Sequence, residues 1–193
     1  MNINFSPHRK RLIVASFVGI MAIGHNAAAI KLSQVSAGTV HTCGLATDGT
    51  VICWGSNEYG QATPPSGTFT QVSAGVHHTC GLTTDGTVAC WGRNYEGQAT
   101  PLRGTFTQVS AGYYHTCGVA TDGTVACWGW DGSGQATPPR GSFTQVRAGW
   151  WHTCGLATDG TVACWGSNGY GQTTPPLPTV SSVSPLTAEL NEL

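Results

Sequence analysis

The chain has 193 residues, enough for one ordinary domain, and charged residues make up only 9% of it, against about a quarter in a typical soluble protein. Apolar residues at 40%, with seven tryptophans, can build a hydrophobic core, which argues against disorder throughout the chain. Eight basic and nine acidic residues give a net charge of −1. Nucleic acid is therefore not an expected partner, because charge-driven binding to phosphates needs an excess of basic residues.

Residues 1–29 have the three-part pattern of a secretory signal peptide. A basic segment at residues 9–11 precedes an apolar run at 12–24, and three alanines follow at 27–29. The apolar run is too short to cross about 30 Å of hydrocarbon as a helix, so cleavage after Ala29 is predicted rather than an uncleaved anchor. Cleavage removes three basic residues and no acidic one. The mature chain is expected to be periplasmic or secreted, with no membrane span.

From residue 30 to residue 179 the chain repeats one unit four times, with a step of 37 residues. The unit reads F-T-Q-V-S-A-G-x-x-H-T-C-G-L-x-T-D-G-T-V-x-C-W-G-x-N-x-x-G-Q-A-T-P-P. The units are expected at about residues 34–70, 71–107, 108–144 and 145–181. A fixed period of this length is typical of solenoids, propellers and other repeat arrays. The tail at 180–193 begins like a further strand, or the start of another domain, and then leaves the pattern.

Each unit is predicted to form about three short strands, because Val, Thr, Phe and Trp dominate it and Gly or Pro recurs every few residues. Strands are predicted at 41–46, 50–54 and 68–74, with a loop at 57–67. Such a small sheet cannot bury its own faces and needs neighbouring sheets.

The first two of these segments flank Asp-Gly, a strong hairpin signal. A three-residue loop with Gly49 in the left-handed conformation pairs Ala46 with Thr50 and places Cys43 opposite Cys53. If the closing pair is hydrogen-bonded, the two cysteines form a non-hydrogen-bonded pair with Cα atoms about 4.5 Å apart, which permits a disulfide. A two-residue loop would instead make the bridge diagonal.

The repeat and the expected export favour one disulfide within each hairpin. The predicted pairs are Cys43–Cys53, Cys80–Cys90, Cys117–Cys127 and Cys154–Cys164. In the chain-entropy description each bridge stabilises the fold by roughly 3 kcal/mol.

The same register sorts the side chains of the hairpin onto two faces. One face carries His41, Cys43, Leu45, Val51 and Cys53. The other face carries Thr42, Gly44, Ala46, Ile52 and Trp54, and later units replace Ile52 by alanine. The bulky face of one unit is therefore expected to pack against the small face of the next.

The repeated pattern resembles the repeat of the regulator of chromosome condensation (RCC1) family, in its short bacterial secreted form, over about residues 32–176. The resemblance implies a β-propeller, usually of about seven blades. For this chain it implies an all-β propeller or partial propeller of four roughly three-stranded blades, each with an internal disulfide. Family members include a GTPase exchange factor, a plant ultraviolet receptor and a secreted β-lactamase inhibitor, so the fold does not specify an activity.

Four units of such a propeller leave three alternatives open. The chain closes as a small ring, associates with another copy through its open end blades, or forms part of a longer propeller. An open end would expose an apolar face that requires a partner.

The recurring polar residues point to structure rather than to catalysis. The histidines are predicted to bond a neighbouring blade or loop: His41, His78, His115 and His152. Zinc binding by His-x-Cys would need reduced thiols, which export disfavours. The recurring aspartates fit the hairpin turns, and no nucleophile motif is present. We expect no enzyme activity, no cofactor and no metal.

The informative positions vary while the repeat stays fixed: the two residues before each recurring His, and the segment after each Trp-Gly pair. The predicted binding surface consists of Tyr113, Tyr114, Trp130, Trp150 and Trp151, with Tyr59, Arg93, Tyr95 and Tyr170 around it. Tyr, Trp and Arg are the residues enriched at binding hot spots. The competing interpretation is that these aromatic rings pack between blades.

These observations predict an exported, non-catalytic module that binds a protein or a glycan. Two alternatives are nucleotide exchange on a small GTPase, by family analogy, and a structural segment of a larger surface protein. The exchange alternative is disfavoured by the predicted export and by the absence of an insertion resembling the loop that engages the GTPase.

Overall fold

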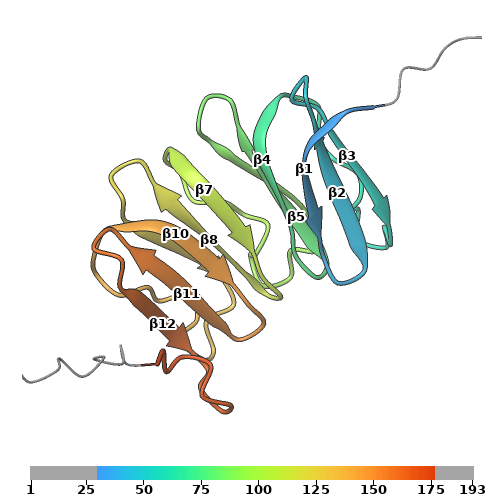
Figure 1. Cartoon of the computed structure of the whole chain (residues 1–193). Coiled ribbons are helices and arrows are strands. Elements are labelled where there is room, and N and C mark those ends of the chain that lie inside the picture. Colours follow the sequence, from blue (N-terminus) through green and yellow to red (C-terminus); the bar gives the residue numbers. More distant parts are fainter. Residues whose placement is uncertain (1–29, 177–193) are drawn as a thin grey trace, which may run out of the picture.

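The computed structural model describes residues 30–176, which form twelve β-strands in four three-stranded antiparallel sheets (Figure 1). The predicted signal peptide and the predicted strand of the tail lie outside the described residues. Between residues 30 and 176 there is no helix with the length and apolar character needed to cross a membrane.

Each sheet is one blade, with its strands in chain order across the sheet. Blade 1 consists of β1 (Leu32–Ala37), β2 (His41–Ala46) and β3 (Val51–Gly55). Blade 2 consists of β4 (Phe69–Ala74), β5 (His78–Thr83) and β6 (Val88–Gly92). Blade 3 consists of β7 (Phe106–Ala111), β8 (His115–Ala120) and β9 (Val125–Gly129). Blade 4 consists of β10 (Phe143–Ala148), β11 (His152–Ala157) and β12 (Val162–Gly166).

The all-β prediction and the three strands per repeat are confirmed, with small differences at the strand ends. The third strand of blade 1 begins one residue later than predicted, because the Thr50 amide donates to the Asp48 carboxylate (3.0 Å) and belongs to the turn. The first strand of blade 2 has a register shift between Phe69 and Gln71 that the sequence pattern did not predict.

The predicted hairpin register is confirmed. The Ala46 amide donates to the Thr50 carbonyl (2.8 Å), Gly49 has a φ of 87°, and Cys43 lies opposite Cys53. All eight cysteines form the four predicted disulfides, with Cα atoms 4.0–4.1 Å apart. The expected left-handed turn glycine therefore sets the register that brings the sulfur atoms together.

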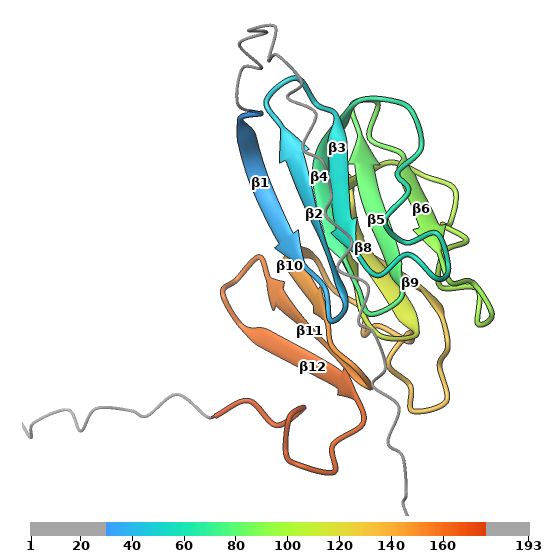
Figure 2. The same ribbon diagram turned by 90° about the vertical axis from the view of Figure 1, so that its right-hand side faces the viewer.

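The blades pack face to face, as the two-faced pattern predicts (Figure 2). At the first junction Cys43 and Leu45 of blade 1 pack against Phe69, Val72 and Trp91 of blade 2. Equivalent buried clusters join blade 2 to blade 3 and blade 3 to blade 4. The described part of the chain thus has three hydrophobic cores, each lying between two sheets.

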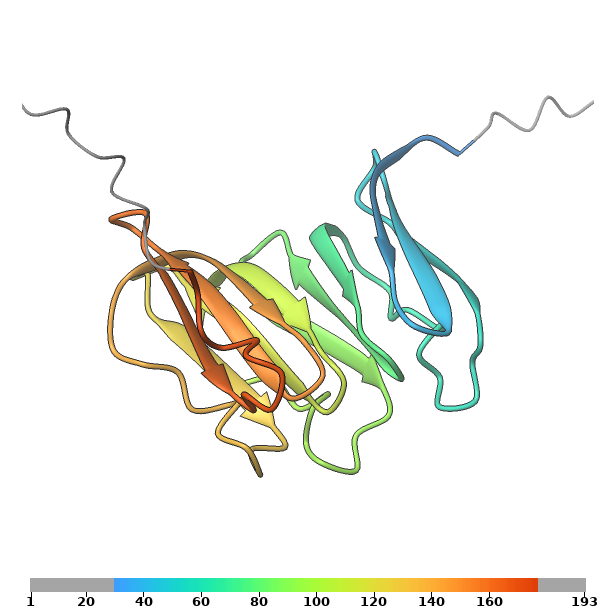
Figure 3. The ribbon, with the colours of Figure 1, turned by 60° about the horizontal axis from the view of Figure 1, so that its bottom comes forward.

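The four blades lie along an open arc, with blade 1 and blade 4 at its two ends (Figures 1 and 3). Of the three alternatives, the closed four-bladed ring is not the arrangement found.

The blades begin at residues 32, 69, 106 and 143, two residues before the units set from the repeat. The turns between first and second strands, and the ends of the third strands, meet at one end of the blades.

Candidate binding surface

A repeated hydrogen-bond relay fixes each blade against the next. The Thr79 hydroxyl donates to the main-chain carbonyl of Gln61 (2.9 Å) and accepts from His41, whose Nε2 lies 2.7 Å away. The Trp91 indole N–H donates to the same Gln61 carbonyl (2.9 Å). The relay recurs at the other two junctions as His78–Thr116–Gln98 and His115–Thr153–Gln135.

The relay accounts for three of the four recurring histidines as structural groups, as predicted. Burial lowers the pKa of His78 to about 3 and that of His115 to about 4, with smaller contributions from nearby histidines. These rings are therefore neutral at physiological pH. Zinc binding through thiolates is not available, because every cysteine is in a disulfide.

The recurring aspartates also have a structural role, in the hairpin turns. Asp48 Oδ1 accepts hydrogen bonds from the amide and the hydroxyl of Thr50, at 3.0 and 2.7 Å. These bonds lower the pKa of Asp48, and the other three hairpins repeat the arrangement. The carboxylates hold the hairpin turns.

Buried glutamines, which the sequence analysis did not single out, position the variable loops. Gln61 is fully buried; its Oε1 accepts from the Tyr59 amide (2.9 Å) and its Nε2 donates to the Ser56 hydroxyl (3.2 Å). Gln98 and Gln135 bond the equivalent amides of blades 2 and 3. Each loop is thereby held so that its side chains meet the next blade.

Eight of the nine predicted binding residues lie together at this end of the blades, in a cluster that we call the aromatic band. The aromatic band consists of Tyr59, His77, Arg93, Tyr95, Tyr113, Tyr114, Trp130, Trp150 and Trp151. Tyr113 lies near its centre, with ring-centroid distances of 3.8 Å to Tyr114, 5.2 Å to Trp150 and 5.9 Å to Trp151. Trp130 meets Trp151 edge-on at 4.8 Å.

His77 joins the two halves of the aromatic band and was not among the predicted site residues. Its ring centre lies 5.2 Å from that of Tyr59 and 6.2 Å from that of Tyr113. Tyr59 in turn lies 6.1 Å from Tyr95. His77 occupies one of the variable positions before a recurring His, and that position could have identified it.

Arg93 supplies the positive charge of the aromatic band. Its guanidinium lies 4.7 Å from the ring centre of Tyr114 and 5.1 Å from that of Tyr95, both within cation–π range. Hydrogen bonds from Tyr113 and Arg93 lower the pKa of the Tyr114 hydroxyl. The band therefore combines aromatic faces, hydroxyl groups and one cation.

The rings of the aromatic band remain open to solvent. Tyr95 is 76% exposed and Trp150 is 57% exposed, while Tyr113, Tyr114, Trp130 and Trp151 are half-buried against one another. None belongs to a buried cluster between blades. Rings from neighbouring blades do contact one another, as Trp130 and Trp151 do, but they do so outside the hydrophobic clusters between the sheets.

Tyr170 is the one predicted site residue that lies apart; it is 99% exposed. It corresponds by the repeat to Tyr59, which packs against His77 of the following blade. Within the described residues no blade follows blade 4, so Tyr170 has no equivalent ring to contact.

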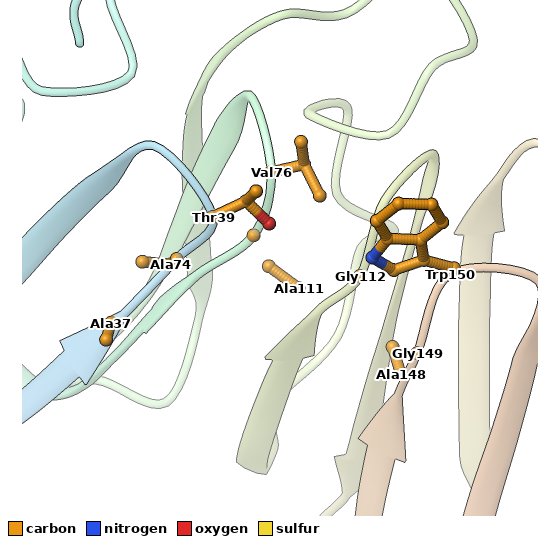
Figure 4. A pocket seen from close by; sticks show the side chains of 11 residues that line it. Ala37, Thr39, Ala74, Val76, Ala111, Gly112, Ala148, Gly149 and Trp150 are labelled. Carbon is orange, nitrogen blue, oxygen red and sulfur yellow. The ribbon is translucent and has the colours of Figure 1, made fainter.

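A shallow recess of about 240 Å³ lies along the inner edge of the arc beside the aromatic band (Figure 4). Small residues from all four blades line it, and the Trp150 indole forms one side. These small residues are required by packing, since a Cβ atom on Gly112 would lie 2.5 Å from the Gly149 carbonyl oxygen. Among the described residues there is no cluster of three or more potential metal ligands.

Compared with known protein families, the chain matches the Regulator of chromosome condensation (RCC1) repeat at residues 32–61, 69–98, 106–135 and 143–172. Each match begins at the first strand of a blade and ends at the glutamine of the following loop. The predicted family resemblance is confirmed by these matches. A comparison with curated proteins found no match.

Solved structures with the same fold include two plant receptor kinase ectodomains. The ectodomain of CR4 from Physcomitrella patens has 34% identity and a TM-score of 0.62, covering 70% of this chain and 39% of that chain. The CRINKLY WD40 ectodomain of ACR4 from Arabidopsis thaliana has 30% identity and a TM-score of 0.59, covering 70% of this chain and 49% of that chain.

The structure of Prp20p from Saccharomyces cerevisiae is also similar, with 19% identity and a TM-score of 0.65, covering 76% of this chain and 47% of that chain. At this identity the similarity shows the fold alone. The chain spans less than half the length of these three proteins. Its arc of four blades matches part of the fold of each. Similarity to the secreted β-lactamase inhibitor stays a prediction.

Proposed function

We propose that this chain, which belongs to the regulator of chromosome condensation (RCC1) repeat family, binds another protein through the aromatic band. The proposed role is non-catalytic. The observation that carries the proposal is the contrast between frame and surface. The turns and the disulfides are the same in every blade and the relay is the same at each of the three junctions, whereas the exposed positions differ and carry Tyr, Trp and Arg. Side chains of this kind on a rigid scaffold are typical of protein-binding hot spots.

The structural relatives support a binding role. The plant relatives are receptor ectodomains. Nucleotide exchange is not proposed, because at 19% identity the likeness to Prp20p carries only the fold.

We also propose that the protein works outside the cytoplasm. Four disulfides within hairpins are stable in an oxidising compartment and are rare in the cytosol. The basic, apolar and small-residue pattern of residues 1–29 supplies the export signal in this proposal. Intact-mass analysis of the protein as the cell makes it tests both parts, because an exported chain begins at Ile30 and takes up an alkylating label only after reduction.

The binding role is tested with immobilised protein and extracellular extract of the source organism. We expect the unmodified chain to retain a specific protein that the Trp150→Ala/Trp151→Ala variant does not retain, and the retained protein, once purified, to bind in calorimetry. Tyr170→Ala is the matched control, since it removes an exposed ring outside the aromatic band. Both variants should keep a melting temperature close to that of the parent.

Two outcomes would contradict the proposal. A large loss of thermal stability in the double tryptophan variant would mean that these rings are core. Retention of glycans but of no protein on the unmodified chain would mean that the aromatic band is a carbohydrate surface.

A further inference from the structure

The two ends of the arc display the two halves of one interface. At the internal junctions Trp91, Trp128 and Trp165 are at most 9% exposed, whereas the equivalent Trp54 of blade 1 is 49% exposed. Val35 is likewise 59% exposed, although its three equivalents are buried. Blade 1 thus presents the face that blades 2, 3 and 4 each place against their predecessor.

Blade 4 presents the complementary half. Leu156 and Val162 are 37% and 50% exposed, whereas their equivalents in blade 2, Leu82 and Val88, are buried against blade 3. A recess of about 780 Å³ lies beside Val162 and Cys164 on this face. At the first junction the equivalent Gly49 carbonyl accepts a hydrogen bond from Phe69 of the next blade (2.8 Å), and the matching group of blade 4 is Gly160.

The polar groups of the two end faces also match. His152 has no equivalent of the Thr79 hydroxyl among residues 30–176, and Thr42 lacks an equivalent of the His41 ring within the same range. Gln172 corresponds to Gln61, whose carbonyl accepts from a threonine and a tryptophan of the next blade. On blade 1 those two donors would be Thr42 and Trp54.

We propose that blade 4 of one chain docks onto blade 1 of a second copy of the same chain, and that the contact repeats the internal blade junctions. His152 donates to Thr42 of the second copy, and Thr42 and Trp54 of the second copy donate to the Gln172 carbonyl. Leu32 and Val35 of the second copy take the places of Phe69 and Val72. This proposal goes beyond the binding role of the aromatic band and does not depend on it.

A second copy of the chain fits these two faces because its exposed residues reproduce most of the contacts of an internal blade junction. Two substitutions change the apolar part of the contact, since Leu32 stands where later blades have phenylalanine and Ile52 where they have alanine. A third changes its hydrogen bonding. Ser36, Ser73 and Ser110 each accept a hydrogen bond from an alanine amide of the next blade, and blade 4 has Arg147 there. The junction between copies therefore has one hydrogen bond fewer than an internal junction.

The proposed contact joins two different surfaces, so association is head to tail and gives a ring if the rotation between copies closes, or an open chain of copies if it does not. This directionality gives a sharp test. Trp54→Asp places a charge on the blade 1 face only, and Val162→Asp places one on the blade 4 face only. Each variant retains one intact half of the interface.

Light scattering coupled to gel filtration measures the mass of the full chain. We expect the parent to have the mass of two or more chains, each variant alone to have the mass of one chain, and a mixture of the two variants to form a species of two chains. Leu102→Asp is the control, since it adds the same charge at an exposed apolar side chain on a loop between blades; it should keep the parent mass.

Several outcomes would overturn the proposal. The proposal would be wrong if the parent had the mass of one chain at every concentration. It would also be wrong if either variant alone still formed dimers, because that would indicate a symmetric contact. A mixture that stays monomeric while both variants keep the parent's circular dichroism spectrum also contradicts head-to-tail docking.

Hydrogen exchange on the unmodified chain keeps the test valid if a variant does not fold. We expect backbone protection to increase with protein concentration in β1, β3 and β12 together. Protection of β12 alone, independent of concentration, would mean that a segment of the same chain, such as residues 177–193, covers blade 4, and the proposal would then be wrong.

Discussion

The Arg93 guanidinium lies 4.7 Å from the ring centre of Tyr114. One repeat later, Trp130 and Trp151 occupy the equivalent positions, and their ring centres are 4.8 Å apart. In both cases the first residue after the Gly that ends the third strand reaches the residue preceding the recurring His of the next blade. The repeated fold thus fixes which two positions are in contact, and the residues at those positions determine whether the contact is cation–π or aromatic.

Removing the charge of Arg93 should change the ionisation of Tyr114. Hydrogen bonds from Tyr113 and from Arg93 lower the pKa of Tyr114, and the Arg93 charge adds to this effect. We therefore expect Arg93→Met to raise the pKa of Tyr114, as followed by NMR of labelled tyrosine. Arg103→Met is the matched control, since it removes the same charge from an exposed loop; an equal shift in both variants would contradict the assignment.

Deleting one relay hydroxyl should destabilise the fold. In Thr116→Val the His78 ring and the Gln98 carbonyl each lose a buried partner. Loss of such partners costs about 1–3 kcal/mol, and urea unfolding measures the change in the free energy of unfolding. Thr144→Val is the control, because the hydroxyl of this exposed strand residue makes only a 3.3 Å contact with the Leu156 carbonyl. Equal effects in the two variants would mean that the relay contributes nothing.

Acid should destabilise the protein before its carboxylates titrate. Burial lowers the pKa of His78 to about 3 and that of His115 to about 4, from an ordinary value of 6.5. Between these values the unfolded chain binds more protons than the folded chain, so stability rises with pH. We expect the free energy of unfolding to be constant above about pH 7 and to fall progressively below about pH 6.5.

The carboxylates provide the internal comparison for the pH experiment. The pKa of Asp85 is lowered to about 2 by hydrogen bonds, first from Thr83 and then from Thr87, so its contribution is lost only below the ordinary value of 3.8. Urea unfolding at about pH 7.5, 5.5 and 4.5, all above the ordinary aspartate pKa, follows the histidines. A flat profile over this range would contradict the buried neutral rings.

The inner edge of the arc should not tolerate a methyl group. In Gly112→Ala the new Cβ would lie 2.5 Å from the Gly149 carbonyl oxygen, so blades 3 and 4 must separate. Overpacking of this kind costs about 1–3 kcal/mol, which a thermal melt detects. Gly169→Ala is the control, because a Cβ there has no atom within 4 Å, and its melting temperature should equal that of the parent.

The blade was predictable from the sequence because its determinants are local. Asp48-Gly49 fixes the hairpin, the hairpin places Cys43 opposite Cys53, and the alternation then sorts the two faces. Each of these steps needs only residues within one repeat.

Features that depend on two blades were predicted less well. Gln61 is buried because Thr79 and Trp91 of the next blade close on its carbonyl, and no local pattern indicates this. His77 and Tyr170 show the same limit, because a ring joins the aromatic band only where the next blade supplies a contact.

The cysteines of each bridge are only 10 residues apart in the chain, which has a consequence for how so repetitive a protein matures. A hairpin holds both of its sulfur atoms, so it can be oxidised as soon as it forms, before later repeats are made. Four nearly identical segments could otherwise exchange strands with one another. Early covalent closure ties every segment to its own partner, so the order of the blades in space follows the order of synthesis.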